Sequence, residues 1–164
     1  MSDSTLLITG SRALASTPEA ATWARAQLAR VLTPQVSVVA GDAGGPDEWA
    51  QVMAPGWATR WCIDGRILAR LTLSGSWALE ARWHDDELPS RGDRAGWKML
   101  CLARDRAMVE HWAERSGVSM LALVAPWSRT RGTQYSVARA REAGIPTTVL
   151  TCPVGHGPRA EVTK

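Results

Sequence analysis

The sequence opens with a short apolar segment that ends in a small polar turn. The apolar residues 6–8 are consecutive, and the turn Thr9-Gly10-Ser11-Arg12 follows them directly. A continuous apolar run bounded by a glycine turn is typical of a strand buried on both faces of a sheet. Because an amphipathic helix is expected soon afterwards, this segment predicts that the chain begins as an α/β unit.

The same order of strand, glycine turn and helix recurs along the chain. Thr17-Pro18-Glu19 predicts a helix start, because it combines a capping hydroxyl, a proline and an acid in the first turn. Helices are expected over residues 18–32, from Pro46 onward, over 96–116 and up to Glu142; further buried strands are expected over 36–40, 118–125 and 145–150. Such units, joined by right-handed crossovers, predict a Rossmann-like, mostly parallel sheet flanked by helices.

The middle of the chain has a different pattern. Asp64-Gly65 and Ser74-Gly75 are hairpin turn pairs, and they separate short strands expected over 60–63, 67–73 and 77–83. We therefore expect an antiparallel hairpin insertion over residues 57–75 of the parallel core. The chain is predicted to form one domain over residues 1–152, followed by a flexible tail over 153–164.

Composition narrows the classes of partner. The formal net charge is +3, from 19 Lys and Arg against 16 Asp and Glu, and the basic residues are nearly all Arg. Arg favours bidentate recognition of planar anions, and no basic run resembles a nucleic-acid-binding tail, so a nucleic-acid partner is not expected. The sequence shows no signal peptide and no apolar run of about 18 residues, so it predicts a cytoplasmic protein without membrane contact.

Metal and thiol chemistry are not expected either. Cys62, Cys101 and Cys152 are far apart in the sequence and form no Cys-x-x-Cys pair, which favours free thiols in a reducing compartment. His84 lies in an acidic loop over residues 84–87, and one histidine in one loop is more typical of a solvated loop than of a metal site.

Four segments should meet at one edge of the sheet, because ligands of such sheets bind beyond the carboxyl ends of the strands. They are residues 10–12, residues 41–47, the helix face that carries Arg104, and residues 130–133. Gly10 would let a ligand approach the backbone, and residues 130–133 before a helix predict a phosphate cradle. The alternatives are ordinary turns and helix caps, and an Arg104 whose stem is buried while its head reaches water.

Taken in order, these motifs resemble the SLOG superfamily, most closely its YspA- and YpsA-related branch of bacterial and phage proteins. The motifs are Gly10-Ser11-Arg12, Gly41-x-x-x-Gly45-x-Asp47, Arg104-Asp105 and Arg131-Gly132-Thr133. The resemblance covers residues 6–150 apart from the region 57–73. Relatives in that superfamily include the LOG phosphoribohydrolases and the DNA-processing DprA proteins.

The resemblance implies a pocket that binds or senses a nucleotide or a nucleotide-derived molecule, such as an ADP-ribose-like ligand. By matching position, the residues expected to line the pocket are Gly10, Ser11, Arg12, Gly41, Gly45 and Asp47, and those expected to hold phosphate are Arg104, Thr130, Arg131, Gly132 and Thr133. Relatives pair through helices, and Trp97 and Trp112 on the long helix, with the tryptophans of the hairpin region, add apolar surface. A homodimer is therefore expected.

Two departures from the family pattern bear on catalysis. The usual Arg-Asn pair is Arg104-Asp105 here, and the glutamate that acts in the LOG enzymes is replaced by Ser136. Asp47 is a weak substitute, and Asp105 is expected to point about 100° away from Arg104 on the helix. The sequence therefore predicts binding without hydrolysis. N-glycosidic hydrolysis of a nucleotide, and less so DprA-like binding of single-stranded DNA, remain alternatives.

Overall fold

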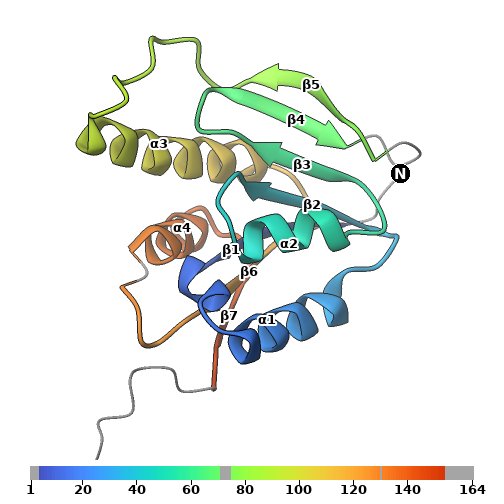
Figure 1. Cartoon of the computed structure of the whole chain (residues 1–164). Helices are drawn as coiled ribbons and strands as arrows, with labels where there is room; N and C mark the ends of the chain where they lie inside the picture. The colour runs from blue at the N-terminus through green and yellow to red at the C-terminus, as the bar shows by residue number, and fades with distance from the viewer. Residues whose placement is uncertain (1–3, 71–74, 130, 154–164) are drawn as a thin grey trace, which may run out of the picture.

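The computed structural model describes residues 4–70, 75–129 and 131–153. Within them, one sheet carries helices on both faces (Figure 1). The elements in chain order are β1 (Ser4–Gly10), η1 (Arg12–Ala15), α1 (Pro18–Val31), β2 (Val36–Gly41), α2 (Pro46–Met53), β3 (Ala58–Trp61), β4 (Arg66–Arg70), β5 (Trp77–Arg82), α3 (Arg94–Ala113), β6 (Val118–Val124), α4 (Arg131–Glu142) and β7 (Thr147–Thr151).

The strand order across the sheet is β5-β4-β3-β2-β1-β6-β7. The strands from β3 through β2, β1 and β6 to β7 pair in parallel, which confirms the predicted Rossmann-like α/β class. The chain moves outward from β1 to β2 and β3 on one side, and it returns to β6 and β7 on the other. The boundary between β1 and β6 is therefore the topological switch point at which such sheets bind ligands.

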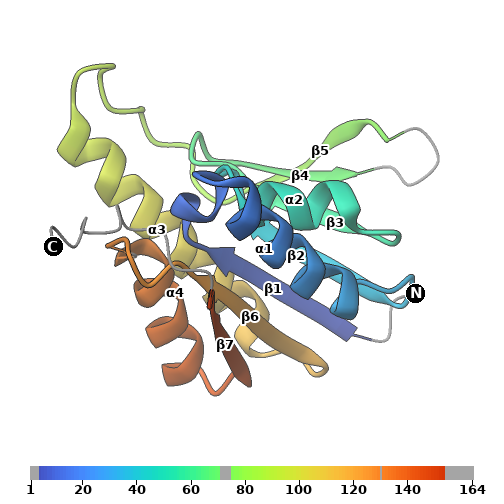
Figure 2. The same ribbon diagram turned by 60° about the horizontal axis from the view of Figure 1, so that its bottom comes forward.

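Both faces of the central strands are covered, and their side chains alternate between two cores. Leu6 and Ile8 of β1 pack into the core formed with α1 and α2, whereas Leu7 packs into the core formed with α3 and α4. Figure 2 shows α1 and α2 on the near side of the sheet, with α3 and α4 beyond it. This arrangement explains the continuous apolar run at residues 6–8, because a strand covered on both faces has no side for polar residues.

The predicted hairpin region is antiparallel only in part. β3 pairs with β4, and β4 with β5, in antiparallel register, as expected. However, β3 also pairs in parallel with β2, with Val38 opposite Ala58 and Gly41 opposite Trp61. The first strand of the expected insertion therefore belongs to the parallel sheet, and only β4 and β5 are added to it. Gly65 has a φ of 93° at the β3–β4 turn, while Ser74 of the second turn lies outside the described residues.

Local signals place most helix ends correctly. The Thr17 hydroxyl accepts a hydrogen bond from the Ala20 N–H at 3.3 Å, so it caps α1 as predicted. Gly144, with a φ of 76°, ends α4 in the left-handed conformation. α3 ends at Ala113, three residues before the expected end, with Glu114 as its C-cap. α3 begins at Arg94 rather than at Gly96, because the Asp93 carboxylate accepts the Gly96 N–H at 2.9 Å, a cap that the sequence analysis missed.

Within the described residues, no helix combines the length and the apolar character needed to cross a bilayer. Cys62 and Cys101 are free thiols. The described residues contain no cluster of three or more His, Cys, Asp or Glu side chains that could hold a metal ion. The predicted tail falls outside the description from residue 154 onward.

Candidate functional site

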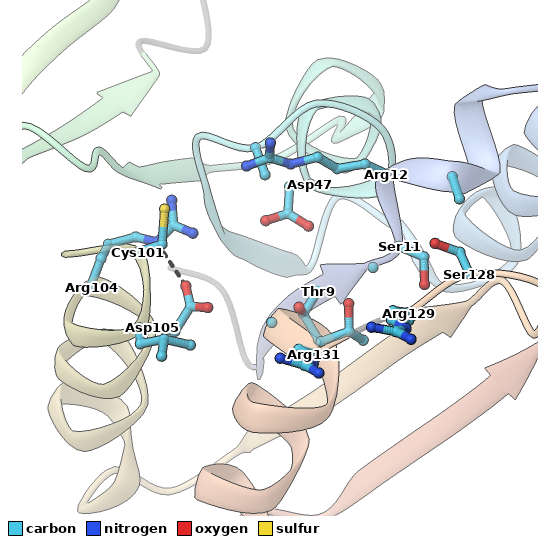
Figure 3. A pocket seen from close by; sticks show the side chains of 16 residues that line it. Thr9, Ser11, Arg12, Asp47, Cys101, Arg104, Asp105, Ser128, Arg129 and Arg131 are labelled. Atoms are coloured by element: carbon cyan, nitrogen blue, oxygen red, sulfur yellow. Dashed lines mark hydrogen bonds and ion pairs between the residues drawn. The ribbon is translucent and has the colours of Figure 1, made fainter. Parts of the chain in front are cut away.

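A pocket of about 270 Å³ opens at the carboxyl ends of β1 and β6, at the switch point of the sheet. Its walls come from the β1–η1 turn, the start of α2, the middle of α3 and the segment that leads into α4 (Figure 3). The predicted site residues that line it are Gly10, Ser11, Arg12, Asp47, Arg104, Arg131, Gly132 and Thr133. Thr130 lies outside the described residues.

Two of the predicted glycines make room for other parts of the protein. A Cβ atom at Gly10 would lie 2.5 Å from Cγ of Pro46, so this glycine allows α2 to pack against β1. Gly10 lines the pocket, but the close approach that it permits is made by Pro46. Gly41 does not line the pocket: a Cβ atom there would lie 2.7 Å from Cζ of Arg104, so Gly41 makes room for that guanidinium.

Gly45 does not line the pocket either. Its φ of 83° and ψ of −136° lie in a region that L side chains rarely adopt, and it is the N-cap residue of α2. Gly132 differs from Gly10 and Gly41, since a Cβ atom there would meet nothing within 4 Å. Among these glycines, Gly132 is therefore the one whose missing side chain leaves open space beside the pocket.

Arg104 is buried and paired. It is 5% exposed, its Nε donates to Oδ1 of Asp105 at 2.7 Å, and its Nη1 donates to Oδ1 of Asp42. The interpretation in which its head reaches water is therefore wrong. So is the expectation that Asp105 points away from Arg104, because the long guanidinium side chain turns back to the next residue. Burial lowers the pKa of Arg104, but Asp105 and Asp42 outweigh it and raise that pKa above its ordinary value.

Asp105 connects α3 to α4. The Ser136 hydroxyl lies 3.1 Å from Oδ2 of Asp105 and 3.2 Å from the carbonyl oxygen of Gly132, and it can donate to either. Burial raises the pKa of Asp105, while the Arg104 guanidinium and the Ser136 hydroxyl act in the opposite direction. The carboxylate beside Ser136 is thus supplied by the neighbouring helix, and it lines the pocket.

Asp47 is the buried acid of the pocket without a full set of partners. It is 6% exposed, and its Oδ1 has no hydrogen-bond partner among the described residues. Burial raises the pKa of this carboxyl group from 3.8 to about 7, while Arg104 lowers it and Asp105 raises it. A backbone hydrogen bond at Gly41 and, less strongly, Arg12 also lower this pKa. We call Asp47, Asp105 and the paired Arg104 the acidic wall.

The opposite side of the pocket is basic. Arg129 and Arg131 are exposed, and neither forms an ion pair within the described part of the chain. Arg131 begins α4, and Arg129 lies two residues before it. The backbone N–H groups of the first turn of α4 have no partner inside the helix. We call Arg129, Arg131 and this first turn the basic wall. Figure 3 shows it across the pocket from the acidic wall.

Ser11 has a structural role at the floor of the pocket. Its Oγ accepts the backbone N–H of Ala125 at 3.0 Å, and its own N–H donates to the carbonyl oxygen of Leu123 at 2.9 Å. These bonds join the end of β1 to the end of β6. A serine hydroxyl also has one proton to donate, so Ser11 can still serve a ligand.

Several residues of the pocket were missed by the sequence analysis. Arg129 lies in the same segment as Arg131, and Cys101 lies one helical turn before Arg104, so sequence spacing could have indicated both. Asp105 was considered and set aside, although it lines the pocket. The other lining residues that were missed are Thr9, Ala13, Ala43, Leu102 and Ser128, and they carry no distinctive signal.

The described residues that line the pocket include no aromatic side chain. They therefore offer no stacking platform of the kind that single-stranded nucleic acid uses. Comparison of the chain with protein-family models, curated proteins and solved structures found no match. The site must accordingly be interpreted from its own geometry.

Proposed function

We propose that this pocket binds a nucleotide or nucleotide-derived small molecule and holds its phosphate against the basic wall. The observation that carries the proposal is the polarity of the pocket. The basic wall, whose arginines form no ion pair among the described residues, lies on one side, and the buried carboxyl groups of the acidic wall lie on the other, with Arg12 beside Asp47. A ligand with an anionic end and a hydroxyl-bearing end is complementary to both sides.

The basic wall suits a phosphate group for three reasons. The first turn of α4 presents backbone N–H groups and the positive end of the helix dipole. Gly132 lies in that turn with open space around its Cα, so an anion can approach the backbone. Arg131 and Arg129 add guanidinium groups that match phosphate oxygens in a bidentate geometry.

The acidic wall does not suit a phosphate, even though it contains Arg104. The charge of Arg104 is already balanced by Asp42 and Asp105, which both contact its guanidinium. A phosphate there would face two carboxylates and the buried carboxyl group of Asp47. The expectation that Arg104 pairs directly with phosphate therefore has less support than the expectation for Arg131.

The volume of the pocket indicates the size of the ligand. At about 270 Å³ it is slightly below the usual range for drug-sized ligands, about 300–1,000 Å³. This favours a mononucleotide over an intact ADP-ribose-like molecule, part of which would have to extend beyond the pocket.

The proposal is tested by titrating the purified protein with AMP, after native mass spectrometry has shown whether a nucleotide co-purifies. Arg131→Ala removes a guanidinium of the basic wall and should weaken AMP binding by at least about tenfold, as expected for a hydrogen bond to a charged group. Arg141→Ala is the matched control, because Arg141 lies on the same helix outside this pocket. Absence of any AMP or co-purified nucleotide binding would contradict the proposal.

N-glycosidic hydrolysis of a nucleotide is the second candidate. It is favoured by the presence of two carboxyl groups, Asp47 and Asp105, in the wall of one pocket. Glycosidic cleavage uses a proton-bearing acid beside an ionised carboxylate, and a pKa of about 7 at Asp47 fits the first role. Chromatography of nucleoside monophosphates incubated with the protein tests this candidate. Release of free base that Asp47→Asn abolishes would establish it.

A further inference from the structure

We propose that Asp47 recognises the sugar of the ligand, and that its carboxylate accepts a hydrogen bond from a ribose hydroxyl group. The inference rests on the proposed function, because it takes the phosphate to lie on the basic wall. It assigns to the acidic wall a separate task, the selection of ligands that carry a hydroxyl-bearing sugar.

The first argument is the incomplete set of partners of Asp47. Its carboxyl group points into the pocket in Figure 3, and Oδ1 has no hydrogen-bond partner among the described residues. A buried acceptor without a donor lowers the stability of the folded protein. Buried polar groups are nearly always partnered in native proteins, so a missing donor on a pocket wall indicates that the ligand supplies it.

The second argument concerns the structural roles of Asp47. A backbone hydrogen bond at Gly41 stabilises its ionised carboxyl group, but Oδ1 still has no partner among the described residues. Asp47 lies in the first turn of α2, where an acid interacts favourably with the helix dipole. Glu48 occupies the next position of the same turn and is exposed. The exposed Glu48 can interact with the helix dipole without losing its hydration. The dipole therefore does not explain why the carboxyl group of Asp47 is buried against the pocket.

The third argument concerns the charge of the donor. Arg104 and Asp105 of α3 and Arg12 of η1 all act on the carboxyl group of Asp47. Asp42, in the loop before α2, is held to Arg104, and Arg131 lies across the pocket at the start of α4. A cationic ligand group would meet Arg12 and Arg104 at this place. Those two positive charges would repel a cationic group but not a neutral donor such as a hydroxyl group. A sugar therefore fits better than an amine.

The proposed contact couples binding to proton release. Because burial raises the pKa of Asp47 to about 7, part of the protein carries a proton on this carboxyl group at neutral pH in the absence of ligand. A hydroxyl donor stabilises the ionised form and lowers the pKa, so ligand binding at pH 7 should release protons from Asp47.

Three compounds separate the sugar from the phosphate: AMP, 2′,3′-dideoxy-AMP and inorganic pyrophosphate. Calorimetric titrations use the wild-type protein, Asp47→Asn and the control Glu48→Gln, which removes the same charge from an exposed site outside this pocket. We expect the wild type to bind AMP at least about tenfold more tightly than the dideoxy compound. Asp47→Asn should remove this preference and leave pyrophosphate binding intact, and Glu48→Gln should keep the preference.

The wild-type protein alone provides a second measurement. Titrations of AMP and of dideoxy-AMP in buffers of different ionisation enthalpy give the number of protons released on binding each compound. Both compounds carry the same phosphate group, so its contribution to proton release cancels in the difference. Greater release with AMP supports the inference, even if Asp47→Asn fails to fold.

Equal wild-type affinity for AMP and dideoxy-AMP would overturn the role of Asp47. A preference for AMP that persists in Asp47→Asn would do the same. Neither result would contradict the phosphate site. Binding of pyrophosphate without binding of either nucleotide would overturn the role of Asp47 as well. If none of the three compounds binds, the proposed function itself fails.

Discussion

The guanidinium group of Arg104 lies against the backbone of Gly41, and a Cβ atom at Gly41 would fall 2.7 Å from its Cζ. This contact brings an α3 side chain to the carboxyl end of β2, where it pairs with Asp42. Asp42 in turn accepts the backbone N–H of Ile63 at 3.0 Å. One buried cation thus connects α3, the β2–α2 loop and the turn after β3, and it supports the acidic wall.

Gly41→Ala should therefore displace Arg104 and destabilise the fold. The added methyl group must push away a guanidinium that is held by two carboxylates, and overpacking of this kind costs about 1–3 kcal/mol. Urea unfolding measures the loss. Gly44→Ala is the control, because a Cβ atom at Gly44 meets nothing within 4 Å. Equal stability of the two variants would contradict the proposed packing.

Arg104→Met should strongly destabilise the folded protein, and its direct effect on ligand binding should be smaller. Removing the cation leaves Asp42 and Asp105 without their shared partner, and breaking a buried pair in this way costs about 3–5 kcal/mol. Arg106→Met, which breaks an exposed pair with Glu110, should leave the melting temperature nearly unchanged, because solvent screens such pairs. Thermal melting distinguishes them. A variant at Arg104 that melts normally but fails to bind AMP would assign Arg104 to the ligand instead.

Asp47→Asn should stabilise the protein, and more so at high pH. The folded protein holds the Asp47 proton up to a pKa of about 7, against 3.8 ordinarily, so stability is lost as pH rises between these values. The amide has no charge to desolvate, and we expect a gain of about 1–3 kcal/mol at pH 8. Urea unfolding at pH 5 and pH 8 gives the difference in the free energy of unfolding between variant and wild type. Asp105 is present in both proteins, so its own titration cancels in this difference. A gain that is the same at both pH values would show that Asp47 does not titrate as described.

Gly132→Val should abolish AMP binding and leave the fold intact. Position 132 lies in the first turn of α4, and a Cβ atom there would meet nothing within 4 Å. Valine is not a worse helix residue than glycine, so the melting temperature should be nearly unchanged. Its branched side chain would occupy the space beside the basic wall. Normal AMP affinity in this variant would exclude the first turn of α4 as the phosphate site.

A homodimer stays a prediction, but Met99 replaces the tryptophans as the apolar surface on α3 that supports it. Trp97 and Trp112 are partly buried in their own chain, and Nε1 of Trp97 donates to the carbonyl oxygen of Ser90 at 3.0 Å. Met99, at 65% exposed, is the larger apolar surface on α3. Sedimentation should show twice the 17.8 kDa mass of one chain, with Met99→Glu shifting it toward the single chain. A 17.8 kDa wild-type species at micromolar concentration would rule the dimer out.

The fold class and the position of the pocket could be predicted from local patterns. Residues 6–8 are apolar without interruption because β1 is covered on both faces. The caps at Thr17 and Gly144 act within one helical turn of their own position, so the neighbouring sequence contains all the information that they need. The glycine turns follow parallel strands, and the carboxyl ends of parallel strands meet at one edge.

What only the tertiary structure decided is how the groups at that edge divide their roles. Gly10 and Gly41 have the residue type expected beside a ligand, yet the atoms that fill their missing Cβ positions belong to Pro46 and Arg104. Arg104 looked available for phosphate, yet Asp42, which is remote in sequence, balances its charge. Asp47 looked like an ordinary helix acid, yet burial between elements raises its pKa to about 7. Burial and charge balance depend on segments far apart in the sequence, so no local pattern contains them.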